Sequence, residues 1–99
     1  MRIISRRTLR QFWEKHSKAK PGLSLWYYRV SDARFDNFQH LREIFPSADS
    51  VGNFTIFNIS GNSYRLITYF NYQDQIVFIR AVLTHQEYDK ENWKNDNWF

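Results

Sequence analysis

The stretch FTIFNISGNSYRLITYFNYQDQIVFIRAVLTHQEYD, residues 54–89, decides the fold. It holds three apolar runs rich in β-branched and aromatic residues, which suit a pleated surface. These runs cover residues 54–59, 64–70 and 76–83. Turn-forming residues separate them, and Gly61 and Asn62 in the first turn accept a positive φ at low cost. We therefore predict a meander of three antiparallel strands.

Polar residues inside these runs carry the functional signal. Arg65 lies within the second run and Arg80 within the third. A guanidinium in the middle of a strand is costly unless it faces water, a carboxylate or a phosphate. His85 and Tyr88 follow where the third run ends. Together these residues predict an anion-binding surface with acid–base groups beside it.

Composition bounds the class of protein. With 99 residues, 42% hydrophobic and 19% aromatic, the chain should form one globular domain spanning residues 1–99. It has no cysteine, and its three histidines lack zinc-ligand spacing, so we expect no metal site and no cofactor. No apolar run approaches the roughly 20 residues of a membrane span. The N-terminus lacks the apolar core of a signal peptide, and we expect a cytoplasmic protein.

The charge is concentrated at one end. The net charge is +4, and residues 1–20 contain seven Lys or Arg against one acid, Glu14. Such a basic end suggests a polyanionic partner, either nucleic acid or a strongly acidic protein. The alternative is a solvated helix face with no partner. Both remain open from charge alone.

The residues before the meander predict a short strand and three helical segments. Leu9, Phe12 and Trp13 share one face of the first helix, and basic residues take much of the rest. Thr84 and Glu87 form a T-x-x-E capping box, which places a last helix directly after the third strand. The predicted segments are a strand at 2–4, helices at 6–17, 21–35 and 37–45, and a loop at 47–53. Two helices before a meander predict an α+β fold in which helices cover one face of a small antiparallel sheet, in the order β-α-α-β-β-β plus a short C-terminal helix.

Five segments also carry a resemblance to a known family. They are RRTLRQFWEKH at 6–16, VGN at 51–53, FNISGNSYRLI at 57–67, VFIR at 77–80 and THQEYDK at 84–90. In these segments the chain resembles the HigB toxins of bacterial type II toxin–antitoxin modules, members of the RelE-like superfamily. The resemblance implies a RelE-like fold and cleavage of mRNA in the ribosomal A site. It also implies a cognate HigA-type antitoxin with a helix-turn-helix, so that operator DNA would be bound only through the complex.

Metal-independent RNA cleavage uses the 2′-OH of the substrate to attack the adjacent phosphate. It needs a base, an acid for the 5′-oxygen and cations that stabilise the charged transition state. We predict that Arg65 and Arg80 contact phosphate, that His85 is the general acid or base, and that Tyr88 stacks on a base or donates a hydrogen bond. Glu87 and Asp89 are weaker candidates for orienting His85. The chain has no Lys between Lys20 and Lys90, which excludes a lysine-based mechanism on the sheet. The predicted RNA-binding residues are Arg6, Arg7, Arg10, Lys15 and Lys90.

Each assignment has a structural alternative. One of the two arginines could pair with an acidic residue, His85 could cap the last helix, and Tyr88 could belong to the core. At the level of function, the alternatives are a non-catalytic RNA- or ribosome-binding module and a partner protein whose arginines meet only an acidic antitoxin. The aromatic tail, with Trp93, Trp98 and Phe99, could cover the sheet or dock a partner.

Overall fold

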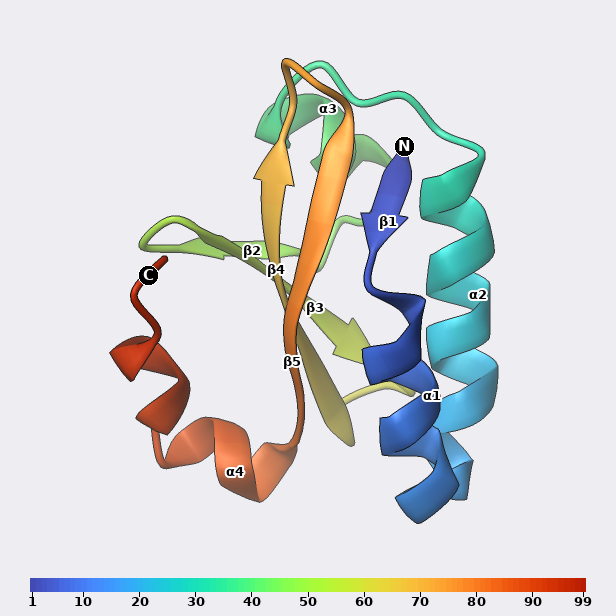
Figure 1. Ribbon diagram of the computed structural model, residues 1–99, viewed down its shortest axis with the longest axis vertical. Helices are drawn as coiled ribbons and strands as arrows, with labels where there is room; N and C mark the ends of the chain where they lie inside the picture. Colours follow the sequence, from blue (N-terminus) through green and yellow to red (C-terminus); the bar gives the residue numbers. More distant parts are fainter.

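The predicted meander forms the centre of a five-stranded sheet. The computed structural model describes residues 1–99. Strands β3 (Phe54–Ile59), β4 (Tyr64–Asn71) and β5 (Ile76–Thr84) pair antiparallel, within one residue of the predicted bounds. Strands β1 (Arg2–Ile4) and β2 (Asp49–Val51) complete the order β1-β5-β4-β3-β2 (Figure 1). The α+β class, the strand at 2–4 and the meander are confirmed.

Two features of the sheet differ from the prediction. The sheet is mixed, because β1 runs parallel to β5. A parallel pair needs a long crossover, and the helices between β1 and the meander provide it. The segment predicted as a loop at 47–53 contains β2, which pairs antiparallel with β3. Gly52 and Asn53 form its two-residue turn, with Gly52 at φ +58°, a hairpin signal that the sequence carried.

The helices are close to their predicted places but shorter. They are α1 (Arg6–Lys15), α2 (Lys20–Ser31), α3 (Phe38–Ile44) and α4 (His85–Asp89), with 3-10 turns η1 (Ser17–Ala19) and η2 (Asn92–Asn95). Pro21 lies in the first turn of α2, where its missing N–H costs nothing. None of the helices is long and apolar enough to cross a lipid bilayer.

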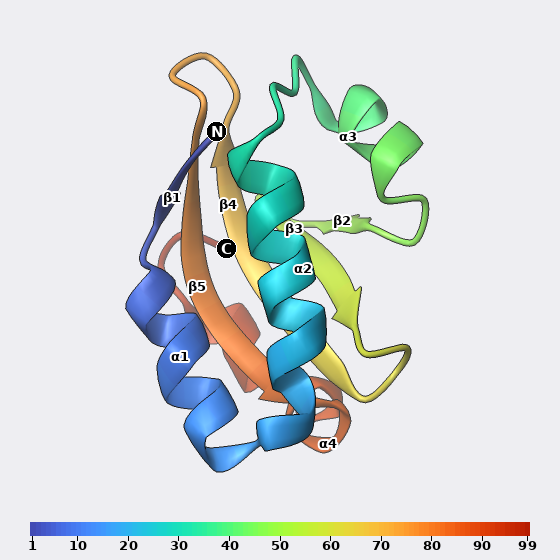
Figure 2. The ribbon, with the colours of Figure 1, turned by 90° about the vertical axis from the view of Figure 1, so that its right-hand side faces the viewer.

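The sheet separates two apolar layers. On one face, which we call the helix face, α1 and α2 pack against the sheet (Figure 2). On the other, which we call the tail face, α4, η2 and the C-terminal residues cover part of the sheet (Figure 1). Alternate residues of β4 serve the two layers, since Leu66 packs with the helix cluster and Ile67 with Trp93 of the tail.

The start of α4 is fixed by the predicted capping box. The Oγ1 atom of Thr84 accepts a hydrogen bond from the Glu87 N–H at 3.2 Å, and the Glu87 carboxylate accepts one from the Thr84 N–H at 2.9 Å. The His85 N–H donates to the Ser63 carbonyl at 3.1 Å, which ties the first residue of α4 to the β3–β4 turn. The capping box thereby fixes where the chain passes from the sheet into α4, and with it the positions of His85 and Tyr88.

Removing this cap should destabilise the protein. We expect Thr84→Ala to lower the free energy of unfolding by about 1 kcal/mol, because a helix N-cap hydroxyl is lost. Thr84→Ser keeps the hydroxyl and should remain close to the wild type. Urea denaturation followed by circular dichroism measures both, and equal stability of the two variants would contradict a stabilising cap.

Candidate active site

Arg65 is a nearly buried guanidinium without a carboxylate partner. Only 9% of the residue is exposed, and its Nη1 atom donates to the carbonyls of Asn62 (3.0 Å) and Tyr64 (3.1 Å). It makes none of the ion pairs in the structure. Asn58 on β3 pairs with Arg65 in the register of β3 and β4, so the two side chains share the tail face. A desolvated guanidinium with free donors favours an incoming anion such as phosphate.

Tyr88 reaches the same place from α4. The Arg65 Cζ atom lies 5.4 Å from the centroid of the Tyr88 ring, and the Trp93 ring stacks on it at 5.1 Å with an interplanar angle of 8°. Burial raises the pKa of the Tyr88 phenol above its ordinary value of 10.0, and the Asp49 carboxylate raises it further. The phenol is therefore protonated at neutral pH and can donate a hydrogen bond rather than accept a proton.

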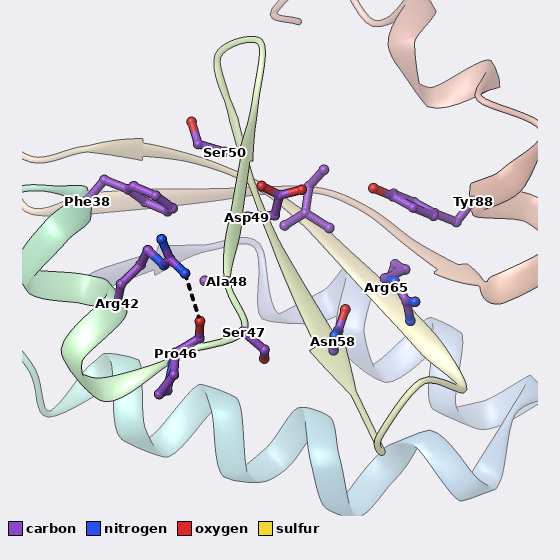
Figure 3. A pocket seen from close by; sticks show the side chains of 11 residues that line it. Phe38, Arg42, Pro46, Ser47, Ala48, Asp49, Ser50, Asn58, Arg65 and Tyr88 are labelled. Carbon is purple, nitrogen blue, oxygen red and sulfur yellow. Dashed lines mark hydrogen bonds between the residues drawn. The ribbon is translucent and has the colours of Figure 1, made fainter.

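A surface hollow of about 460 Å³ joins these groups with residues from β2, β3 and α3. Its lining includes Arg42, Asp49 and Asn58 beside Arg65 and Tyr88. Figure 3 shows the Tyr88 hydroxyl and the Asp49 carboxylate pointing toward one another. The hollow thus combines two guanidinium groups, one phenol and one carboxylate.

Nine of the 11 residues that line the hollow were not named from the sequence, and three of them, Asn58, Asp49 and Arg42, carry an amide or a charge. Asn58 could have been found, because it is a polar residue in an apolar run and alternation places it on one face with Phe54 and Ile56. Asp49 and Arg42 lie on elements that are distant from β4 in the sequence. No local pattern connects them to Arg65, and only the tertiary structure brings them there.

His85 lies at the same end of the sheet but outside the hollow. Its side chain is 50% exposed, and its Nδ1 atom is 3.0 Å from the Asp89 carboxylate. Asp89 thus orients the imidazole, as predicted for this residue, whereas Glu87 is used in the capping box. The backbone N–H of His85 bonds to Ser63, between the two carbonyls that hold Arg65. The backbone of His85 is thus attached to the turn that also holds the Arg65 guanidinium.

Arg80 is not brought together with Arg65. It is the extra residue of a β-bulge, since Ile67 pairs with Ala81 and Thr68 pairs with Ile79. Its Nε and Nη2 atoms donate to the Asp96 carboxylate at 2.9 and 2.8 Å, and its Cζ atom lies 3.9 Å from the Trp98 ring centroid. This geometry favours the structural alternative for Arg80, a pair with an acidic residue, over contact with phosphate.

The predicted RNA-binding residues of α1 lie away from the hollow. Arg7, Arg10 and Lys15 are exposed, and Arg6 packs its guanidinium carbon 4.7 Å from the Tyr27 ring centroid. Because α1 packs on the helix face, the sheet stands between these residues and Arg65 (Figure 2). Lys90 is exposed at the end of α4, on the side of the sheet that carries Tyr88.

Comparison with known proteins shows the family to which the chain belongs. The sequence model of HigB_toxin, described as the RelE-like toxic component of a toxin-antitoxin system, matches residues 19–91. This chain belongs to the HigB toxin family. The mRNA interferase toxin HigB of Escherichia coli (strain K12) is 29% identical over 92 residues, which cover 90% of this chain and 88% of that protein. The mRNA interferase HigB of Escherichia coli O6:H1 is 26% identical over 93 residues, covering 91% and 90%.

The HigB family match spans every element that builds the hollow. Residues 19–91 include α3, the whole meander and α4, and thereby Arg42, Asp49, Asn58, Arg65 and Tyr88. They leave out all of α1 and the tail that carries Asp96. In this HigB-family chain the hollow places guanidinium groups, which suit a phosphate, beside a phenol and the carboxylate of Asp49, and His85 lies outside it.

The Arg80–Asp96 pair predicts a pH dependence of stability. Hydrogen bonds from Arg80 hold the pKa of the Asp96 carboxyl below its ordinary value of 3.8. The stabilisation is therefore complete above pH 3.8 and is lost as the pH falls through the lower folded-state pKa. We expect Asp96→Asn to be less stable than the wild type at pH 7, with a difference that shrinks as the pH falls below 3.8. Urea unfolding across this range measures it, and a difference independent of pH would contradict the pairing.

Proposed function

We propose that this HigB-family protein is an mRNA interferase, an endoribonuclease that cleaves mRNA on the ribosome. The observation that carries the proposal is the nearly buried, carboxylate-free guanidinium of Arg65 beside the protonated phenol of Tyr88. Two further features support it. They are membership of the HigB family and the activity by which its relatives are named, mRNA interferase.

The chemistry follows from the groups in the RNA itself. The 2′-oxygen attacks the adjacent phosphorus, and the bond from phosphorus to the 5′-oxygen breaks. The products are a 2′,3′-cyclic phosphate and a 5′-hydroxyl, so that the proton lost by the 2′-OH is balanced by one given to the 5′-oxygen. This step needs a base, an acid and stabilisation of the charged phosphorane, and it needs no metal ion.

We assign these roles to residues around the hollow. Arg65 binds the scissile phosphate through its free donors, and Tyr88 donates a hydrogen bond to the phosphate or the leaving oxygen. His85 exchanges the protons, since its imidazole is exposed and has one nitrogen that can accept a proton and one that can donate it. Asp49, which faces Tyr88 across the hollow, is the second candidate for the base. We do not assign Arg80 to phosphate, because Asp96 already accepts from two of its donor atoms.

The partners follow from the toxin–antitoxin family. We propose a cognate HigA-type antitoxin with a helix-turn-helix, which silences the toxin and carries the complex to operator DNA. We place the activity in the cytoplasm, where mRNA is translated. The basic face of α1 is separated from the hollow by the sheet, and we assign it to phosphates of ribosomal RNA rather than to the cleaved strand.

The first experiment measures mRNA cleavage by the purified protein, with and without programmed ribosomes. We expect cleavage only with ribosomes, and a loss of about 10²- to 10⁴-fold in His85→Ala, as for removal of a general acid or base. Cleavage of naked RNA would keep the nuclease and remove the ribosome requirement. Wild-type cleavage that His85→Ala retains in full would remove His85 from the mechanism.

Arg65 offers the most direct test of phosphate binding. We expect Arg65→Ala to reduce cleavage by about 10²- to 10³-fold, because a preorganised cation at the transition state is lost. Arg34→Ala is the matched control, since Arg34 is exposed and pairs only with Asp36. Asp49→Asn separates the two base candidates, with a loss comparable to that of His85→Ala if Asp49 takes the proton. Equal activity of Arg65→Ala and Arg34→Ala would contradict the site.

The basic face of α1 should act on binding rather than on the chemical step. We expect Arg7→Ala combined with Arg10→Ala to weaken ribosome binding. The slope of log K against log salt should become shallower by about 0.7 for each phosphate that the variant no longer neutralises. The cleavage rate at saturating ribosomes should stay unchanged. Filter binding at several salt concentrations measures the slope, and a slope equal to that of the wild type would leave α1 as a solvated helix face.

The second candidate function is a ribosome-binding module without turnover. It is favoured by the position of His85, whose imidazole pairs with Asp89 outside the hollow. Such a module would bind programmed ribosomes with the wild-type affinity in His85→Ala and would cleave nothing in either form. The same assay therefore distinguishes the two functions.

A further inference from the structure

We propose that the C-terminal segment Trp93–Phe99 is a brace that fixes the Tyr88 phenol in the hollow, and that Arg80 acts as a positioning residue by anchoring this brace through Asp96. The inference rests on the proposed function, in which Tyr88 contacts the reacting phosphate. Arg80 thereby supports cleavage without contacting the RNA.

Trp93 holds Tyr88 at two points. Its ring stacks on the Tyr88 ring at 5.1 Å with an interplanar angle of 8°, and its Nε1–H donates to the Tyr88 carbonyl at 3.0 Å. Trp93 is 9% exposed and packs into the cluster of the tail face with Phe54, Ile56 and Ile67. One residue of the segment therefore sets both the ring plane of Tyr88 and the end of α4.

Tyr88 needs such support because α4 is short. The helix has five residues, and none of them is buried. A single helical turn with little buried surface has low intrinsic stability. The capping box fixes its first residue, but Tyr88 lies in its second half, where no cap side chain acts. The orientation of the phenol is thus set by Arg65 and by the cluster of the tail face, of which Trp93 stacks on the ring.

Asp96 ties the segment to the sheet. Its carboxylate accepts two hydrogen bonds from Arg80 and a third from the Trp98 N–H at 2.8 Å. The Arg80 guanidinium in turn lies under the Trp98 ring, 3.9 Å from the centroid. The side chains of Arg80 and Asp96 are 27% and 19% exposed, so that this pair is screened less than an ion pair on the surface. The bulge at Arg80 aims it at the segment.

The end of the segment closes against the β2–β3 hairpin. The Phe99 carbonyl accepts from the Asn53 N–H at 3.4 Å, and the Phe99 ring packs edge-on against Trp93 at 5.6 Å. A Cβ atom on Gly52 would lie 2.8 Å from the Phe99 ring, which shows how closely the hairpin and the ring approach. Contacts therefore run continuously from Arg80 through Asp96 and the aromatic residues of the segment to Tyr88.

The competing view is that Arg80 binds the phosphate of RNA and that Asp96 pairs with Arg80 only while no RNA is bound. The two views predict opposite effects at Asp96. If Arg80 binds phosphate, Asp96→Ala frees the guanidinium and leaves cleavage unchanged or faster. If Arg80 anchors the brace, Asp96→Ala and Arg80→Ala cause the same loss, and the double variant loses no more than either single variant.

The test compares Arg80→Ala, Asp96→Ala and the double variant in the ribosome cleavage assay. We expect each to lower kcat by about 10- to 100-fold with KM nearly unchanged, as for a misplaced catalytic group. Trp93→Leu should lower kcat to a similar extent, and Trp93→Phe, which keeps a stacking ring, should recover part of the rate. Glu91→Gln is the matched control, because it removes a carboxylate that is bonded only to Lys94. Loss in Arg80→Ala with full activity in Asp96→Ala would overturn the proposal.

A second measurement needs no RNA. Ring-labelled tyrosine NMR follows the titration of the Tyr88 phenol, whose signal Tyr88→Phe identifies. We expect the pKa of Tyr88 to fall toward its ordinary value of 10.0 in the Arg80, Asp96 and Trp93→Leu variants, because the released ring gains solvent, and to stay unchanged in the control Arg34→Ala, which removes a charge that does not act on Tyr88. An unchanged Tyr88 titration in folded variants would refute the brace. A wild-type protein that cleaves no RNA would refute the proposed function and leave this measurement as the test of the brace.

Discussion

The structure depends on the burial of β4 from both sides. Leu66 and Ile67 are 0% and 1% exposed, and they face opposite layers of the molecule. If a strand that is buried on both faces shifted its register by one residue, the side chains of the helix face and those of the tail face would exchange places. The same constraint places Arg65 on the tail face beside Asn58, at the end of the strand where the sheet meets α4. The position of the candidate site follows from this packing.

Burying the Arg65 guanidinium costs free energy, and no carboxylate pairs with it to offset this cost. The carbonyls of Asn62 and Tyr64 accept hydrogen bonds from one of its nitrogens, and the face of the Tyr88 ring lies against its positive charge. The other N–H groups of Arg65 and its positive charge can therefore attract an anion. Burial, and after it the Asp49 carboxylate across the hollow, raise the pKa of the Tyr88 phenol and favour its protonated, hydrogen-bond-donating form. In a HigB-family protein this combination is consistent with chemistry at a phosphate.

The elements of the fold were readable from local patterns. Apolar runs with β-branched residues gave the meander to within one residue, and the T-x-x-E box gave the start of α4. The strand β2 and the parallel pairing of β1 were not predicted. Two of the three residues of β2 are exposed, so no apolar run marks it, and the pairing of β1 depends on where the helices carry the chain. The helices end before the predicted residues, and α2 does so because Ala33 and Phe35, which continue its apolar spacing, pack against the core from outside the helix.

For the candidate site, the sequence by itself determined the chemistry that was available. Arginines within apolar strands, a histidine and a tyrosine at the end of the last strand, and the order of these segments can be read without coordinates. Only the tertiary structure decided which of them meet. It joined Arg65 and Tyr88 with Asp49, and it gave Arg80 to Asp96 in the tail. The reason is physical: two arginines look alike in sequence, but the nearest carboxylate after folding determines which one remains free to bind an anion.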